Sequence, residues 1–406
     1  MISPDVVTEE WAADGCRGKY VVSMAQPLMG MSELDLILNC WRSGAPGAVL
    51  ATVVHVKGSA YRRPGARMLI LPDGTRIGSI SGGCLEGDVC QKAWWLTQNA
   101  KPALRVYDST SDDDAVWEFG LGCNGVVQVL LERIDSPDVE ESLHYIEASR
   151  SNRTPAVVAT VISTPPASSL KVGSRLMLDD AHVSGSLAGT KHRGTLCEHA
   201  RVALREGTNR TVELEGHQLF IEAIQPPLPL VIFGAGPDAI PLVSLAKWLG
   251  WFVVVADGRP AYARQDRFAQ ADRVVLTSAD DPTGGIVIDH GTAVILMTHN
   301  YLQDRKLLEC IVPLSPRYLG VLGPRTRTSR LLEHFDPTVD SCELHAPIGL
   351  DIGAETPEGI AMSIVAEIQA TLAGRAGEML KLRRGPIHAR EQTEGEETAM
   401  QEGRRA

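Results

Sequence analysis

The stretch LPLVIFGAGPDAIPLVSLAKWLGWFVVVAD, residues 228–257, has the pattern of a β-α-β unit. Its first apolar run has the length of a buried strand, the two glycines that follow permit a tight turn, and the next segment has the length of a helix. A second apolar run, WFVVVAD, again has strand character. Two buried strands joined by a helix run parallel, so this stretch predicts a parallel sheet covered by helices.

The same alternation continues towards the C-terminus. Further strands are expected in DRVVLTS, TAVILMTHN and RYLGVLG, all after residue 270. Thr356 as N-cap and Pro357 at the first helical position open a helix that Gly374 closes. We predict an α/β chain in which residues 226–375 form a Rossmann-like, doubly wound parallel sheet, followed by a disordered tail over 376–406.

The turn after the first strand matches the dinucleotide-binding pattern G-x-G-x-x-A in its usual strand-to-helix context. Gly234 and Gly236 let the backbone approach a pyrophosphate, and Asp257 ends the next strand, where an acid holds a ribose hydroxyl. Asp238 in the first helical turn opposes a phosphate there, whereas Arg259 offers a phosphate a partner. Nucleotide binding and a purely structural role of this fold both remain open.

The composition is that of a soluble globular protein with more than one domain. The chain has 406 residues, of which 44% are hydrophobic and 22% charged, and its formal net charge is -11. This charge gives no general attraction to nucleic acid or to anionic membranes. The start lacks the pattern of a secretory signal, and Asp238 and Lys247 interrupt the longest apolar region. We therefore expect a cytoplasmic protein without a membrane span.

The region before the parallel sheet has a different organisation. After an extension over residues 1–30, residues 31–225 have the short strands, hairpins and helices of an α+β domain. Residues 139–225 either complete the first sheet of this domain or form a subdomain. Two glycine-rich loops in the domain each carry a cysteine, SISGGCLEG and GLGCNG.

The first of these loops has the features of a reactive cysteine. Gly82 and Gly83 permit positive φ and a helix begins directly afterwards, so Cys84 is expected at a strand-to-helix corner. The helix N-terminus stabilises a thiolate there, and Glu86 either carries a proton or complements the helix dipole. The alternative is that Cys84 is a compact residue in a tight turn.

Basic and sulfur-containing side chains accompany this corner. Arg62, Arg63 and Arg67 of the preceding turn, GSAYRRPGARM, add positive charge near the thiol. Cys123 of GLGCNG has a similar glycine context, and two converging thiols can bind a soft metal or its sulfur ligands, or carry sulfur. The remaining cysteines are interpreted as ordinary reduced thiols.

Seven motifs, taken together and in order, resemble the xanthine dehydrogenase accessory protein family, XdhC/CoxI. They are GSAYRRPGARM, GSISGGCLEG, GLGCNG, VIFGAG, MTHN, YLGVLGPRTR and PIGLDIGAETPEGIAMSIVAEI, and the resemblance runs from about residue 33 to residue 374. It implies a cytoplasmic maturation factor that binds the molybdenum cofactor, as molybdopterin or its dinucleotide form. Such a factor supports sulfuration of the cofactor by a cysteine desulfurase and passes it to a molybdenum hydroxylase apoenzyme, such as xanthine or carbon monoxide dehydrogenase.

The resemblance also implies roles for particular residues. Cys84 and Cys123 lie near the molybdenum or its labile sulfur, and the basic turn holds the pterin phosphate. The Rossmann edge accommodates the nucleotide if the cofactor is the dinucleotide form. The expected cofactor-binding set is Cys84, Cys123, Arg62, Arg63, Arg67, Gly82, Gly83, Glu86, Gly234, Gly236, Asp257, Arg259 and His299.

Two other classes of function are weighed against this one. An NAD(P)-dependent oxidoreductase is suggested by the glycine motif and by His299, which ends a strand at the carboxyl edge of the sheet. A thiol redox enzyme would pair Cys84 with Cys90 or Cys123. A homodimer is compatible with any of the three functions, although the sequence contains no clear interface signal.

Overall fold

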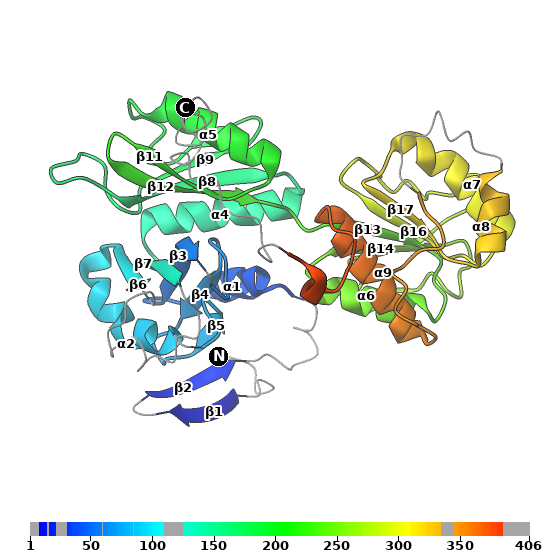
Figure 1. Cartoon of the computed structure of the whole chain (residues 1–406), viewed down its shortest axis with the longest axis horizontal. Coiled ribbons are helices and arrows are strands. Elements are labelled where there is room, and N and C mark those ends of the chain that lie inside the picture. The colour runs from blue at the N-terminus through cyan, green and yellow to red at the C-terminus, as the bar shows by residue number, and fades with distance from the viewer. Residues whose placement is uncertain are drawn as a thin grey trace. The chain divides into compact units, whose positions relative to one another are not determined.

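The computed structural model of the chain describes residues 8–13, 16–21, 31–58, 60–83, 85–108, 125–333 and 344–384. Two compact units make up the chain (Figure 1). The core of one begins at Glu33 and ends at Pro226, and the other continues from Pro227. No helix in the described ranges has both the length and the apolar composition needed to cross a membrane.

The second unit contains the parallel sheet that its sequence predicts. Its strand order is β15-β14-β13-β16-β17-β18, and every neighbouring pair is parallel. The order of connection reverses between β13 and β16, which is the switch point where sheets of this kind bind ligands. The strands are β13 (Pro229–Phe233), β14 (Phe252–Asp257), β15 (Arg273–Leu276), β16 (Ala293–Leu296), β17 (Tyr318–Val321) and β18 (Leu344–His345).

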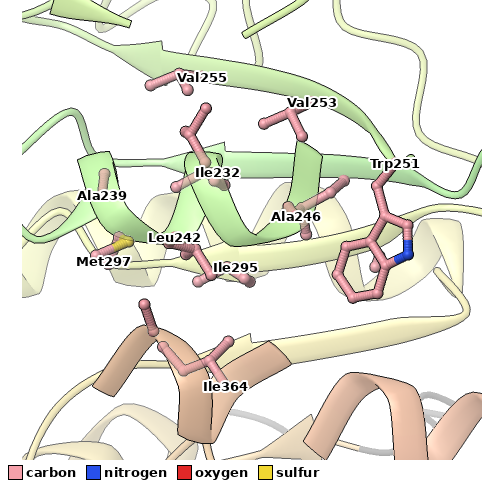
Figure 2. Close-up of a cluster of buried hydrophobic side chains, with 14 of the residues drawn as sticks. Ile232, Ala239, Leu242, Ala246, Trp251, Val253, Val255, Ile295, Met297 and Ile364 are labelled. Carbon is pink, nitrogen blue, oxygen red and sulfur yellow. The ribbon is translucent and has the colours of Figure 1, made fainter. Parts of the chain in front are cut away.

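Helices cover both faces of this sheet (Figure 1). On one face, Leu242 of α6 and Ile364 of α9 pack with Ile232 and Ile295 of the sheet in a buried cluster (Figure 2). On the other face, α7 and α8 pack against a second buried cluster. The prediction of a doubly wound Rossmann-like sheet is confirmed. The helices are α6 (Ala239–Trp248), α7 (Tyr301–Ile311), α8 (Arg325–Leu332) and α9 (Pro357–Leu372), with 3-10 turns at Gln265–Arg267, Val312–Leu314 and Leu380–Leu382.

The first unit is α+β, also as predicted, and it contains two sheets. The first sheet has the order β1-β2-β5-β4-β3-β7-β6. Its strands are β1 (Thr8–Ala13), β2 (Cys16–Val21), β3 (Val49–Gly58), β4 (Arg67–Ile70), β5 (Arg76–Gly78), β6 (Ala103–Asp108) and β7 (Gly125–Arg133). The helices of this half are α1 (Glu33–Arg42) and α2 (Glu86–Leu96), followed by a 3-10 turn at Gln98–Ala100.

Residues from 137 onward form a second sheet and do not extend the first. The order of this sheet is β10-β9-β8-β12-β11, and all of its pairs are antiparallel. Its strands are β8 (Ala156–Ser163), β9 (Arg175–Leu178), β10 (Val183–Ser184), β11 (Arg210–Leu214) and β12 (His217–Ile224). The accompanying helices are α4 (Pro137–Asn152) and α5 (Arg193–Glu206).

The two halves of the first unit are copies of one motif. AVLATVV at 48–54 corresponds to AVVATVI at 156–162, and GARMLI at 65–70 corresponds to GSRLML at 173–178. Each copy places a helix before its first strand, a second helix after its third, and a hairpin at its end. Helices α1 and α4 share one buried cluster with both sheets, whereas α2 and α5 cover the outer faces. The sequence analysis missed this duplication.

Glycines confirm the correspondence at the backbone level. Gly78 in the first copy and Gly185 in the second both have positive φ, at 82° and 96°. A Cβ on Gly78 would lie 2.4 Å from the carbonyl oxygen of Arg67, and one on Gly185 would lie 2.5 Å from that of Arg175. The backbone approaches a neighbouring carbonyl too closely for a side chain at both positions, so both copies require glycine there.

Two buried ion pairs join the copies reciprocally. Arg67 of β4 donates from Nη1 and Nη2 to the carboxylate of Glu222 on β12, at 2.7 and 2.5 Å. Arg175 of β9 donates to Glu132 of β7 in the opposite direction. Side-chain exposure is 10% and 9% in the first pair and 6% and 2% in the second. Each copy therefore neutralises a buried charge of the other.

The copies differ most in one connection. Strands β11 and β12 are joined directly through Glu215 and Gly216, whereas residues 109–124 separate β6 from β7. Cys123 belongs to this longer segment, and Cys84 occupies the position that corresponds to Lys191. Both cysteines of the predicted site are therefore confined to the first copy.

We predict that Arg175→Met lowers the free energy of unfolding by about 3–5 kcal/mol, because Glu132 then stays buried without its cation. The double variant Arg175→Met/Glu132→Leu should recover most of this loss. Chemical denaturation measures both, and Arg264→Met, from an ion pair whose side chains are 58% and 63% exposed, serves as the control. Equal effects of the buried and exposed variants would contradict the prediction.

Candidate functional site

The duplication separates scaffold residues from candidate site residues. Arg67 has a counterpart in Arg175 with the same pairing, so its role belongs to the scaffold that both copies share. Arg67 was predicted to face an anionic ligand, but the structure places its guanidinium in the buried contact with Glu222. By contrast, Cys84 and Arg62 correspond to Lys191 and Leu170 in the second copy. A function specific to the first copy must depend on residues such as Cys84 and Arg62, which have no equivalent side chain in the second copy.

A buried carboxylate organises the loop that precedes α2. Glu86 is fully buried and accepts hydrogen bonds from the backbone N–H groups of Ser81 and Ile80, at 2.8 and 3.2 Å. The Ser81 hydroxyl donates to Glu86 and accepts from the N–H groups of Gly83 and Leu85, at 3.1 and 3.2 Å. Cys84 lies outside the described residues, but its two neighbours are thus held by one serine.

The same contacts keep Glu86 ionised. Burial raises the pKa of this carboxyl, but hydrogen bonds from the Ser81 side chain and from backbone N–H groups outweigh burial and lower it. This arrangement supports an anchoring role for Glu86 over proton transfer. The second copy has Ala188 and Arg193 at the positions of Ser81 and Glu86, so it lacks the hydroxyl and the carboxylate that form the network.

The basic turn lies directly beside this loop. A Cβ on Gly82 would lie 3.7 Å from the ring of Tyr61, whose residue is 72% exposed. Gly83 has φ of 113°, and a Cβ there would meet no described residue within 4 Å. The two motifs that the sequence analysis singled out therefore meet, and no described residue fills the space beside Gly83.

The arginines of this turn have different environments. Arg62 pairs with Glu33 at the start of α1, and its side chain is 29% exposed. Arg63 is half-buried. Because Arg67 is committed to the interface between the copies, Arg62 and Arg63 are the arginines of the turn that remain candidates for ligand contact.

The last described residues before the segment that carries Cys123 lie close to α2. Cys123 lies outside the described residues, but the strands on either side of its segment are described up to Asp108 and from Gly125. The Tyr107 hydroxyl donates to Asp88 in the first turn of α2 at 2.8 Å, and burial together with this hydrogen bond raises the pKa of Tyr107. The bases of both cysteine segments therefore lie at the N-terminal end of α2.

In the second unit, Asp257, the acid expected to hold a ribose, already accepts hydrogen bonds from nearby residues of the chain. Asp257 is 3% exposed and accepts from the N–H of Ala235 at 2.8 Å. Arg259 donates to the same carboxylate from Nε and Nη2, at 2.8 and 2.7 Å. Burial raises the pKa of Asp257, but these hydrogen bonds lower it overall. The group exposed towards a ligand is thus the guanidinium of Arg259, at 51%.

The glycine turn is covered in a similar way. Gly234 has φ of 123°, and a Cβ there would lie 2.3 Å from the carbonyl oxygen of Met297. A Cβ on Gly236 would lie 2.4 Å from Oδ1 of Asp238, whose Oδ2 lies 2.8 Å from Nε2 of His299. The Asp238–His299 contact bridges the ends of β13 and β16, so a carboxylate already lies at the switch point.

Within the described residues, no cluster of three or more His, Cys, Asp or Glu side chains has a geometry that could hold a metal ion. Among the polar contacts that the sequence analysis did not predict are those of Ser81 and of the Tyr107–Asp88 pair. The Ser81–Glu86 spacing is not that of a capping box, so it gives no local signal. The Tyr107–Asp88 contact depends on how the strand and the helix pack.

Comparison with known proteins gives a consistent picture. A model described as the XdhC Rossmann domain matches residues 230–368, and a model described as the XdhC and CoxI family matches residues 40–108 and 149–215. The two segments of the latter match correspond to the two copies. The chain is 36% identical over 345 residues to a probable xanthine dehydrogenase subunit of Bacillus subtilis, covering 84% of this chain and 98% of the relative.

Two further similarities extend over most of the chain. The molybdenum cofactor insertion chaperone PaoD of Escherichia coli is 25% identical over 327 residues, covering 79% of this chain and 82% of that protein. A crystal structure described as a xanthine dehydrogenase from Bacillus halodurans superposes with a TM-score of 0.73 at 33% identity. That match covers 85% of this chain and 97% of the other.

We predict that Glu86→Gln lowers the free energy of unfolding by about 2–3 kcal/mol at neutral pH, because an amide cannot replace the ionised acceptor. Since the folded-state pKa of Glu86 lies below its ordinary value of 4.5, this difference is complete above that value and shrinks as the pH falls through the lowered pKa. Denaturation curves from about pH 3 to pH 7 measure it. The exposed Glu141→Gln should change little, and a pH-independent deficit in Glu86→Gln would refute the assignment.

We also predict that Asp238→Ala increases the affinity for NADP at least about tenfold, because a carboxylate no longer covers the glycine turn. Isothermal titration calorimetry compares the variant with the wild type, and Asp266→Ala, which alters an exposed acid, is the control. If the wild type already binds NADP as tightly as Asp238→Ala, the covering role of Asp238 is wrong.

Proposed function

The chain belongs to the XdhC and CoxI family, and from this premise we propose that it binds the molybdenum cofactor and delivers it to a molybdenum hydroxylase. A relative that aligns over most of its length is named as a molybdenum cofactor insertion chaperone, which supports this proposal. The cofactor is cargo in this role, so the protein needs a site that holds a ligand and releases it to a partner.

One observation carries the proposal: a duplicated scaffold bears cysteines at the site position in one copy only. The scaffold contacts recur in both copies, including the positive-φ glycines and the buried ion pairs. The cysteine loop, the Glu86–Ser81 network and the long connection between β6 and β7 have no equivalent in the second copy. Such asymmetry is expected when one copy keeps a ligand site and the other keeps only its packing.

The chemistry of the donor set suits this cargo. Thiolates are soft ligands and suit molybdenum or its labile sulfur, so we assign Cys84 and Cys123 to that end of the cofactor. Gly83 offers space for it beside the loop, since a Cβ there would meet no described residue within 4 Å, and Gly82 lies against the ring of Tyr61. Arg62 and Arg63 are assigned to the pterin phosphate.

The protein itself contributes binding and orientation. The Glu86–Ser81 network holds the backbone N–H groups of Gly83 and Leu85, the residues on both sides of Cys84. Glu86 acts through the loop and is therefore a positioning residue. The sulfur supplied to the cofactor comes, in this proposal, from a cysteine desulfurase partner.

The Rossmann unit has a less direct part in the proposal. Arg259 exposes its guanidinium next to Asp257 and suits a phosphate of the dinucleotide form of the cofactor, with Gly234 and Gly236 nearby. The carboxylate of Asp238 over the glycine turn disfavours a nicotinamide-dependent oxidoreductase. A cytoplasmic location and a homodimer remain expectations from the sequence.

We predict that Cys84→Ser/Cys123→Ser loses most of the bound molybdenum and pterin while its melting temperature stays close to that of the wild type. The protein is purified from cells that synthesise the cofactor, and molybdenum per chain is measured together with the fluorescence of the oxidised pterin. Cys310→Ser, which changes an exposed thiol of α7, is the matched control. Full retention of cofactor by the double variant would rule out the assigned thiols.

A further inference from the structure

A groove opens on the first unit next to the basic turn. It has a volume of about 190 Å³ and lies between α1, residues 62–67 and the end of β12. Leu34 lies at its surface, whereas Ile37 and Ile224, at 0% and 4% exposure, lie beneath it. The groove is therefore large enough for part of a small molecule.

Charged pairs lie at two places in this groove. Arg62 and Glu33 pair at its rim, where their side chains are 29% and 45% exposed. Arg67 and Glu222 pair in its floor, where exposure falls to 10% and 9%. The floor pair belongs to the interface between the copies, whereas an incoming ligand can reach and replace the rim pair.

The rim pair specifies the chemistry of that ligand. The Glu33 carboxylate accepts one hydrogen bond, from Nη2 of Arg62. Its two oxygens would suit a group with adjacent, parallel N–H donors. A 2-amino-4-oxopyrimidine ring presents the same arrangement through its ring N–H and its amino group. Such a ring can replace Arg62 on Glu33, and Arg62 is then available for an anion.

We infer that this groove binds the 2-amino-4-oxopyrimidine edge of a pterin through Glu33, with the ring beside Leu34. The inference rests on the proposed function and deepens it, because it names where the end of the cofactor remote from the metal is held. Guanine presents the same edge, so the guanine of a dinucleotide form is a second source of this chemistry.

The position of the groove agrees with such a ligand. Tyr61 lies against Gly82 of the cysteine loop, and the next residue, Arg62, lines the groove. One turn of chain therefore separates the groove from the loop in which Cys84 is expected. A molecule that carries a pterin at one end and a thiolate-binding metal at the other is suited to contact both.

The experiment titrates the full-length protein with 6-hydroxymethylpterin, which has the ring edge but neither dithiolene nor phosphate, and follows the pterin fluorescence. Guanosine monophosphate is the competitor with the shared edge, and adenosine monophosphate is the competitor without it. Glu33→Gln removes one acceptor of the rim pair. Glu215→Gln is the matched control, because Glu215 forms an exposed ion pair with Lys191 beyond the other end of β12.

We expect saturable binding of the pterin that Glu33→Gln weakens at least about tenfold and Glu215→Gln leaves unchanged. Arg62→Gln should leave this affinity equal or higher, because it removes the group that competes for Glu33. Competition by guanosine monophosphate but not by adenosine monophosphate supports recognition of the shared edge. Tighter binding of the pterin than of guanosine monophosphate identifies the pterin as its source, and the reverse order overturns the assignment to the pterin.

The inference is overturned if the wild type binds no pterin, or if Glu33→Gln and Glu215→Gln behave alike. Molybdenum per chain, measured on wild-type protein from cofactor-producing cells, separates this failure from failure of the proposed function. If the wild type retains molybdenum but Glu33→Gln does not weaken pterin binding, only the assignment of the groove is wrong. Absence of molybdenum and pterin from the wild type removes the proposed function as well.

Discussion

The reciprocal ion pairs between the two copies are the constraint on which the first unit depends. A buried arginine without a carboxylate, or the reverse, is strongly destabilising, so neither sheet can move away from the other without exposing or stranding a charge. Arg67 and Glu222 therefore fix the start of β4, and with it the basic turn that ends there. The position of the candidate site thus depends on the Arg67–Glu222 ion pair, although this pair includes neither of the candidate cysteines.

The sequence was sufficient to predict the second unit, because its strands and helices alternate and each has a clear apolar pattern. The helix from Pro357 is an example, since Thr356 accepts a hydrogen bond from the N–H of Gly359 as a cap should. The structure gives Arg67 a partner that the sequence pattern did not predict. A local sequence pattern shows that a side chain is charged, but its partner here lies 155 residues away.

The duplication was missed for a related reason. Similarity between the copies is confined to short segments such as 48–54 and 156–162, and the residues between the matching segments differ in identity and charge. Gly65 and Gly173 are an example of a feature that both copies share, since both have positive φ and each lies close to a glutamate of the other copy. Backbone geometry and buried charge constrain a sequence more strongly than loop identity does, so the relationship is clearer in three dimensions than in the sequence.

The long connection between β6 and β7 has a thermodynamic consequence. In the second copy the corresponding strands are joined through Glu215 and Gly216, so the first copy has extended its connection by roughly three doublings in length. Each doubling of a connection's length adds only about 0.6 kcal/mol of loop-closure entropy, so added length at this place costs little stability. A duplicated domain can therefore acquire a cysteine-bearing segment through a modest loss of stability, with no change to the strands that support it.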